Sequence, residues 1–172
     1  MVIGGTFRDV VVRAASTRDL DSVLIGQPEL PAALMREAGF RRVPGPRHAW
    51  RYRVGDRAVD LEVAAVASSA EAAGPFSVAF RHARTAVIEG TEVPVPRIED
   101  YVILKLLAAA ADRRRRARDL ADVQYVFEAF RAEAANVLSI PRLRARLRDL
   151  YGVSGARLKE LVALLRQVPR PE

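Results

Sequence analysis

The stretch "IGGTFRDVVVRAASTRDLDSVLIG" (residues 3–26) combines a Gly-Gly pair with two closely spaced carboxylates. Within it, "RDLDSVLI" alternates polar and apolar residues, which predicts a β-strand. Alternate side chains of a strand share one face, so Asp19 and Asp21 could grip a single Mg²⁺ ion, whose remaining ligands would be water and substrate phosphates. Gly4 and Gly5 lack a Cβ, so their backbone amides could approach phosphate oxygens closely. The alternatives are solvated edge carboxylates and a simple tight turn.

A second acidic pair lies about forty residues further along the chain. The segment "RAVDLEV" also reads as a strand, and it places Asp60 and Glu62 one residue apart. A third carboxylate beside Asp19 and Asp21 would complete a two-metal arrangement for in-line phosphoryl chemistry. Asp60 is the candidate for that carboxylate, and a solvated polar strand face is the alternative.

The rest of the first half predicts short mixed elements. Gly39 should end a helix over residues 28–40, whose apolar face would carry Leu30, Leu34 and Ala38. Gly55-Asp56 and Glu89-Gly90 mark turns. We expect a helix over 6–14 and strands over 18–25, 40–43, 48–54, 57–66, 76–80 and 85–96.

From Arg97 onward the hydrophobic pattern becomes helical. Helices are predicted over 97–115, 116–130, 140–152 and 154–168, and Ser154 is a candidate N-cap of the last one. Pro96 therefore marks the expected boundary. We expect an α+β core over residues 1–96 and a helical part over 97–172 that packs on it.

Composition restricts the class of protein. The chain has no cysteine, which excludes disulfides and thiolate metal sites, and no apolar run approaches a membrane span. The net charge of +7 is uneven, with 12 basic and 11 acidic residues before Arg97 but 16 and 10 after it. This asymmetry favours a polyanionic partner such as RNA, although the preference for Arg over Lys also fits biased genomic composition. We expect a cytoplasmic protein without membrane attachment.

Several motifs in order resemble one family. They are "GG-x13-DLD", "VDLEV" and "VPVPRIEDYVILKLLAAAADRRRRARDLADV", and over about residues 2–127 they resemble nucleotidyltransferases of the DNA polymerase β type, in the branch of the AbiEii and MenT toxins. The resemblance implies a mixed β-sheet core with flanking helices. It also implies a Gly-Gly turn at Gly4 and Gly5, a nucleotide-binding Thr17-Arg18 pair, metal ligands Asp19, Asp21 and Asp60, a "K-L-x-A" helix with Lys105, and an "R-D-L-x-D" segment with Asp119 and Asp122. Only three residues precede Gly4, fewer than in the family, so we expect a minimal core or a start further upstream.

The residues of the later motifs can be interpreted chemically. Lys105 on a helix suits a triphosphate contact, and a surface lysine is the alternative. Asp119 and Asp122 lie three residues apart on one helix face, where they could accept a proton from an acceptor hydroxyl or form ion pairs with Arg118 or Lys105.

Three other features carry weaker predictions. The run Arg113–Arg116 could steer a nucleotide or RNA, or could be a solvated connection. The histidines, His48 and His82, have no ligand spacing and are expected to be ordinary strand residues. Trp50 and Tyr52 share a strand face and are expected to pack in the sheet.

Together these features predict an enzyme that transfers a nucleoside monophosphate from a nucleoside triphosphate to an acceptor hydroxyl. Two Mg²⁺ ions held by Asp19, Asp21 and Asp60 would assist, and Lys105, Asp119 and Asp122 would take part in catalysis. The 3′ end of a tRNA is one candidate acceptor, and a protein hydroxyl or a small molecule are others. The resemblance implies a toxin with a cognate antitoxin; the alternative is a catalytically silent module that binds RNA or protein.

Overall fold

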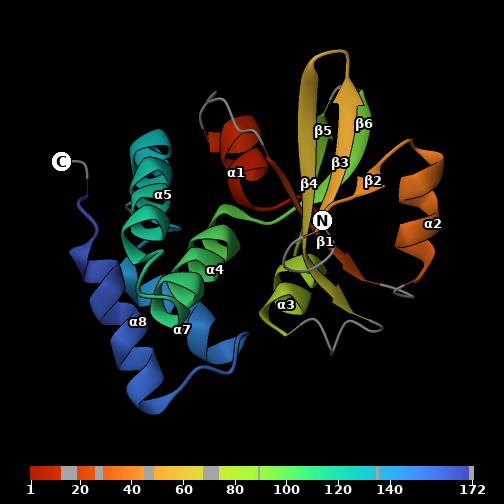
Figure 1. Ribbon diagram of the computed structural model, residues 1–172. Helices are drawn as coiled ribbons and strands as arrows, with labels where there is room; N and C mark the ends of the chain where they lie inside the picture. The colour runs from red at the N-terminus through yellow and green to blue at the C-terminus, as the bar shows by residue number, and fades with distance from the viewer. Residues whose placement is uncertain are drawn as a thin grey trace. The chain divides into compact units, whose positions relative to one another are not determined.

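The Asp-Leu-Asp segment forms an edge strand of a four-stranded mixed sheet in a computed structural model of the chain (Figure 1). The strands are β1 (Asp19–Ile25), β2 (Arg41–Arg42), β3 (Ala49–Val54) and β4 (Arg57–Ala67), in the order β1-β4-β3-β2. β1 runs parallel to β4, whereas β3 is antiparallel to both β4 and β2. The predicted mixed sheet is confirmed.

The structure describes residues 1–12, 19–25, 29–44, 49–67, 74–88, 90–134 and 136–170. Its contacts divide the chain into two units, Met1–Pro96 and Arg97–Glu172. The first unit holds the sheet and the second holds only helices, so the fold is α+β. None of the helices found in the described ranges is long and apolar enough to cross a membrane.

The Gly-Gly pair lies beside β1. It begins the single helical turn α1 (Gly4–Phe7), which continues into a π-helical turn, η1 (Arg8–Val12). Gly4 adopts a φ of +63°, a left-handed conformation that favours glycine. Val2 pairs with Ser22 of β1, and the Val23 amide donates a hydrogen bond to the Met1 carbonyl at 2.8 Å. This pairing fixes the start of the turn against the edge strand.

One helix, α2 (Glu29–Glu37), covers the apolar face of the sheet. Ala32 and Met35 pack against buried Trp50 and Leu61. The expected apolar face was wrong at two positions, because Leu34 is 53 % exposed and Ala38 is exposed; the side chain of Leu30 is not among those described. Periodicity gives the spacing of an apolar stripe, but the position of Trp50 and Leu61 decides which of two neighbouring stripes is buried.

The turns of the first unit follow the sequence signals. Gly39 follows α2 with a φ of +83°, and a Cβ there would come within 3.1 Å of the Tyr52 ring. Gly55, at a φ of +59°, turns the chain between β3 and β4. Of the two aromatic residues expected to pack in the sheet, Trp50 is 5 % exposed, whereas Tyr52 is 38 % exposed and lies against Phe40.

One predicted strand is a helix. The segment "FSVAF" belongs to α3 (Pro75–Arg81), which begins at a proline, a residue preorganised for the first turn of a helix. Five apolar residues are too few for periodicity to separate a strand from a helix. The strands β5 (Arg84–Ile88) and β6 (Thr91–Val95) then form the expected hairpin as a separate two-stranded sheet.

The second unit consists of five helices in the described ranges. Its core includes Val102, Leu106, Val123, Phe127 and Leu161, all fully buried. Ser154 precedes the last helix in an extended conformation, but its side chain makes no capping hydrogen bond. The helices are α4 (Ile98–Ala111), α5 (Arg116–Ala129), α6 (Arg131–Ala134), α7 (Ile140–Asp149) and α8 (Gly155–Gln167).

Candidate active site

The acidic segments occupy adjacent parallel strands. The register pairs the Cα of Asp19 with that of Asp60, and the Cα of Asp21 with that of Glu62. Neighbouring strands lie about 4.8 Å apart, and paired positions belong to the same face of a sheet. The backbone therefore brings together Asp19, Asp21 and Asp60, although Asp19 and Asp60 are forty-one residues apart in sequence.

The proposed nucleotide-binding residues fall into two groups. Gly4 and Gly5 are described, and the pairing of Val2 with Ser22 places the chain that precedes them alongside β1. Thr17 and Arg18 lie outside the described residues, so their predicted role stays a prediction.

Lys105 occupies a buried acidic environment in the second unit. Its Nζ lies 3.1 Å from Asp119 Oδ1 and 2.6 Å from Asp122 Oδ2. The Lys105 side chain is 10 % exposed and those of Asp119 and Asp122 are 0 % and 4 % exposed, so the surface-lysine alternative is wrong. Of the two ion-pair partners weighed for the aspartates, the structure selects Lys105, because Arg118 is exposed.

Local sequence explains this arrangement. α4 is apolar on nearly all sides and packs against α5, α7 and α8, so a lysine within it cannot readily reach water. Asp119 and Asp122 lie one helical turn apart on α5, which directs both carboxylates toward the same neighbour. The Lys105 Nζ also lies 5.7 Å from the centre of the Tyr101 ring, a distance suited to a cation–π contact.

The cluster contains a polar atom without a partner. Two carboxylates and one ammonium carry one net negative charge, and Asp119 Oδ2 is buried without a hydrogen bond to any described residue. A buried oxygen without a donor is costly, which makes it a candidate for function. Chemically, this oxygen can accept a hydrogen bond or a proton.

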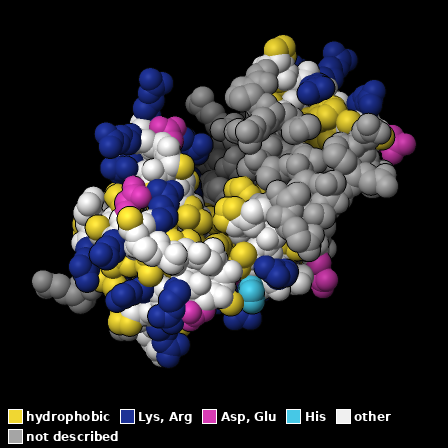
Figure 2. Space-filling view, turned by 90° about the horizontal axis from the view of Figure 1, so that it is seen from below, with side chains coloured by type: hydrophobic (Ala, Val, Ile, Leu, Met, Phe, Trp, Pro, Cys, Tyr) yellow, Lys and Arg dark blue, Asp and Glu magenta, His cyan; other side chains and the backbone are white. Residues whose placement is uncertain are grey.

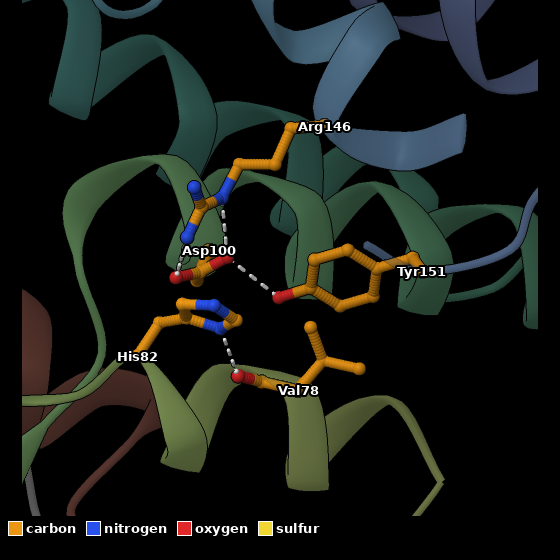
Figure 3. Close-up of polar contacts among 5 residues, drawn as sticks. All are labelled: Val78, His82, Asp100, Arg146 and Tyr151. Atoms are coloured by element: carbon orange, nitrogen blue, oxygen red, sulfur yellow. Dashed lines mark hydrogen bonds and ion pairs between the residues drawn. The ribbon is translucent and has the colours of Figure 1, made fainter. Parts of the chain in front are cut away.

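A second buried cluster in the same unit was missed by sequence reasoning. Asp100, at the start of α4, accepts hydrogen bonds from Arg146 Nε at 2.7 Å and from Arg146 Nη2 at 2.6 Å (Figure 3). The Tyr151 hydroxyl donates to the same carboxylate at 2.8 Å. The hydrogen bond and charge of Asp100 raise the pKa of Arg146, whereas burial and then Asp100 raise the pKa of Tyr151.

This cluster joins α4 to the end of α7. Its members are separated by 46 and 51 residues, and no local spacing signals such a pairing. The one available signal was the presence of two acidic residues, Glu99 and Asp100, in the first turn of a largely apolar helix, which also fits a simple interaction with the helix dipole.

Comparison with known families identifies the chain. Residues 9–169 match the family described as the nucleotidyl transferase AbiEii toxin of a Type IV toxin–antitoxin system. The chain belongs to the AbiEii family. It is therefore a nucleotidyltransferase of a toxin family. No curated protein matches the chain.

The AbiEii match extends beyond the motifs that suggested it. Those motifs ended near residue 127, whereas the match continues through α7 and α8 to residue 169. The helices after α5 are thus part of the AbiEii family pattern. The match includes the strands that carry Asp19 and Asp60, and the helices that carry Lys105 and Asp119, but it begins after Gly4 and Gly5.

The run Arg113–Arg116 of this AbiEii member is mostly exposed, and only its last residue is half-buried. Arg113, Arg114 and Arg115 are exposed before α5, whereas Arg116 is half-buried and donates from Nε to the Ala109 carbonyl at 3.0 Å. Figure 2 shows basic side chains spread widely over the face in view, and exposed arginines also lie outside this run, on α7 and α8.

His82 was expected to be a strand residue, and this was wrong. It follows α3, and its Nδ1 lies 2.9 Å from the Val78 carbonyl (Figure 3). His48 lies outside the described residues. Among described side chains, no three histidines or carboxylates are grouped so that they could hold a metal. The side chains of Asp19, Asp21 and Asp60 are not among those described.

Proposed function

We propose that this nucleotidyltransferase transfers a nucleoside monophosphate from a nucleoside triphosphate to an acceptor hydroxyl with the help of Mg²⁺. The observation that carries the proposal is the parallel register of β1 and β4, which pairs Asp19 with Asp60. An acidic residue at this position of each strand has no role in the hydrophobic core. Its carboxylate is instead suited to binding a hard cation such as Mg²⁺.

The donor set fits magnesium. Asp19 and Asp21 alternate along one strand and Asp60 is paired with the first of them, so three carboxylate-bearing positions share one region of the sheet. Mg²⁺ is bound in proteins by a small number of carboxylates together with substrate phosphates. When bound, the metal ions would neutralise triphosphate charge and help to orient the acceptor oxygen.

The transfer itself is a displacement at phosphorus. The acceptor hydroxyl oxygen forms a bond to the α-phosphorus, and the bond to pyrophosphate breaks. The hydroxyl proton leaves to a carboxylate, for which Asp119 and Asp122 are the candidates. Gly4, Gly5, Thr17, Arg18 and Lys105 are assigned to binding of the nucleotide, to which Lys105 would contribute a positive charge.

The proposed acceptor is the 3′-terminal hydroxyl of a tRNA. The 3′ end of a tRNA presents a hydroxyl on a polyanion, which suits a chain with a net charge of +7. As a member of a toxin family, the protein would have a cognate antitoxin as its regulatory partner.

A transfer assay with an isosteric variant tests the metal site. Purified protein is incubated with each labelled nucleoside triphosphate, Mg²⁺ and total tRNA. We expect incorporation by the unmodified chain and a loss of at least 100-fold in Asp19→Asn, because one ligand charge is removed while the side-chain shape is kept.

The matched control is Asp56→Asn, which changes the same charge in the exposed turn between β3 and β4. It should retain full activity. Equal activity of the Asp19 and Asp56 variants would exclude Asp19 as a metal ligand, and failure of every nucleotide to be incorporated would contradict the proposed transfer to tRNA.

A further inference from the structure

A group of arginines surrounds a hollow at the β2 edge of the sheet. The hollow has a volume of about 330 Å³. Three of its four arginines are exposed and Arg51 is half-buried. The lining residues are Gly39, Arg41, Arg42, Val43, Arg51 and Arg53.

This arrangement opposes the stability of the sheet. The antiparallel register pairs the Cα of Arg41 directly with that of Arg51, and like charges at directly opposed positions destabilise a strand pair. Within the described part of the chain, Arg41, Arg42 and Arg53 form no ion pair with a carboxylate. The exposed guanidinium groups of Arg41, Arg42 and Arg53 are therefore available to bind an anion.

The register connects this hollow to the carboxylate positions. Arg41 pairs with Arg51, Arg51 with Asp60, and Asp60 with Asp19, so one row crosses all four strands. Positions paired in this way lie on one face, and the strand spacing puts β2 about 10 Å from β4. This face is opposite to the one that carries buried Trp50 under α2, on which Arg42 lies because it pairs with Trp50.

We propose that the arginine hollow binds backbone phosphates of a nucleic-acid acceptor and directs its terminal hydroxyl toward Asp60 and Asp19. The direction of the hydroxyl toward these two carboxylates rests on the function proposed for them above. Guanidinium groups bind phosphate through paired hydrogen bonds, and several of them around one sheet edge suit consecutive phosphates of a nucleic-acid strand. The hollow thus selects a nucleic acid over a small molecule or a protein hydroxyl as the acceptor.

The sheet order separates this hollow from the proposed nucleotide site. The chain that leads into Gly4-Gly5 pairs with β1, at one edge of the sheet, whereas the arginines surround β2 at the other edge. Acidic positions on β1 and β4 lie between them. The triphosphate and the acceptor would therefore approach the carboxylates from opposite edges of the sheet.

Direct RNA binding by the full chain tests this assignment. Fluorescently labelled total tRNA is titrated without nucleotide or Mg²⁺ at several salt concentrations, so that the result does not depend on transfer activity. We expect Arg41→Ala/Arg53→Ala to weaken binding by about 10-fold or more and to reduce the salt dependence by about two phosphate contacts.

The matched control, Arg81→Ala/Arg84→Ala, removes the same charge from exposed positions of the same unit outside the hollow. It should weaken binding less than 3-fold. Arg41→Lys/Arg53→Lys keeps both charges and should keep the salt dependence. Thermal melting confirms folding of each variant, and both arginines are exposed, so each substitution should be tolerated.

Three results would overturn the inference. One is an equal loss of tRNA affinity in Arg41→Ala/Arg53→Ala and in the control Arg81→Ala/Arg84→Ala. Another is a loss of Mg²⁺-nucleotide affinity with unchanged tRNA affinity, which would assign the arginines to the triphosphate. The last is displacement of tRNA by polyglutamate as effectively as by unlabelled RNA, which would indicate an acidic protein partner. Failure of the transfer assay alone would contradict the proposed function and leave this binding result intact.

Discussion

A single buried lysine forms ion pairs with two buried aspartates in the helical unit. Lys105 lies 2.6 Å from Asp122 Oδ2 and 3.1 Å from Asp119 Oδ1, and all three side chains are at most 10 % exposed. Buried charges are tolerated when each has an oppositely charged partner. Removal of Lys105 should therefore lower the stability of the protein far more than removal of an exposed lysine would.

Lys105→Met should therefore destabilise the protein strongly. The methionine keeps the apolar stem but leaves two carboxylates without their cation, at a cost of about 3–5 kcal/mol in the free energy of unfolding at pH 7. Urea unfolding followed by circular dichroism measures the change.

The chain provides a natural control for this prediction. Lys159, its one other lysine, is exposed on α8, so Lys159→Met should change the free energy of unfolding by less than about 0.5 kcal/mol. Equal effects of the two substitutions would show that the Lys105 cluster contributes nothing to stability.

At the scale of elements, α4 and the end of α7 are joined by Asp100, Arg146 and Tyr151. Burial and the adjacent Asp100 raise the pKa of Tyr151 above its ordinary value of about 10. In the unfolded chain this hydroxyl titrates near pH 10, whereas in the folded chain it stays protonated. The stabilisation from Tyr151 is thus fully present below pH 10 and is lost progressively as the pH rises above it.

Tyr151→Phe should remove this pH dependence. At pH 8 the variant should lose about 1–2 kcal/mol of stability, because the buried Asp100 carboxylate loses a donor. Between pH 9.5 and 11 its stability should fall less steeply than that of the unmodified chain. Urea unfolding across this range measures both effects.

Tyr52→Phe is the matched control, because Tyr52 is 38 % exposed and lies outside this cluster. Its stability should follow the pH profile of the unmodified chain. The same profile in Tyr151→Phe would contradict the raised pKa of Tyr151.

The sequence was a good guide to elements with strong local signals. Gly39 and Gly55 sit at positive φ where turns were predicted, and the long helices α4 and α5 follow the apolar spacing of Val102, Leu106 and Phe127. The segment "FSVAF" failed, because five apolar residues fit either structure and Pro75 favoured a helix.

What the sequence could not supply was the pairing between distant segments. Asp19 and Asp60 were identified as candidate ligands separately, but only the parallel register of β1 and β4 makes them neighbours. Likewise, Arg146 and Asp100 are 46 residues apart, and no periodicity connects them. Opposed arginines on β2 and β3 became visible only once the register was known.

At the scale of the whole molecule, ligand binding should appear as added thermal stability. A ligand that binds only the folded chain stabilises it by about 2.7 kcal/mol at 100 times its dissociation constant. If Asp19, Asp21 and Asp60 hold Mg²⁺ with a nucleoside triphosphate, the melting temperature should rise when both are present.

Removal of the metal provides the comparison. Excess EDTA should reverse the rise, and nucleotide without Mg²⁺ should give a smaller one, because the carboxylates would repel the triphosphate. Asp19→Asn should show little increase, whereas Asp56→Asn should match the unmodified chain. An increase that is insensitive to EDTA would indicate nucleotide binding without the metal.

The parallel pairing of β1 with β4 also has a consequence for the order of events during synthesis. β3 and β4 are joined by a two-residue turn and can pair as soon as both have left the ribosome. β1 is made first, yet β4 begins more than thirty residues later, so Asp19 lacks its parallel partner strand until β4 exists. The acidic positions of a toxin-family enzyme are thereby kept apart on the nascent chain, and they are brought together only after the intervening helix and hairpin have been translated.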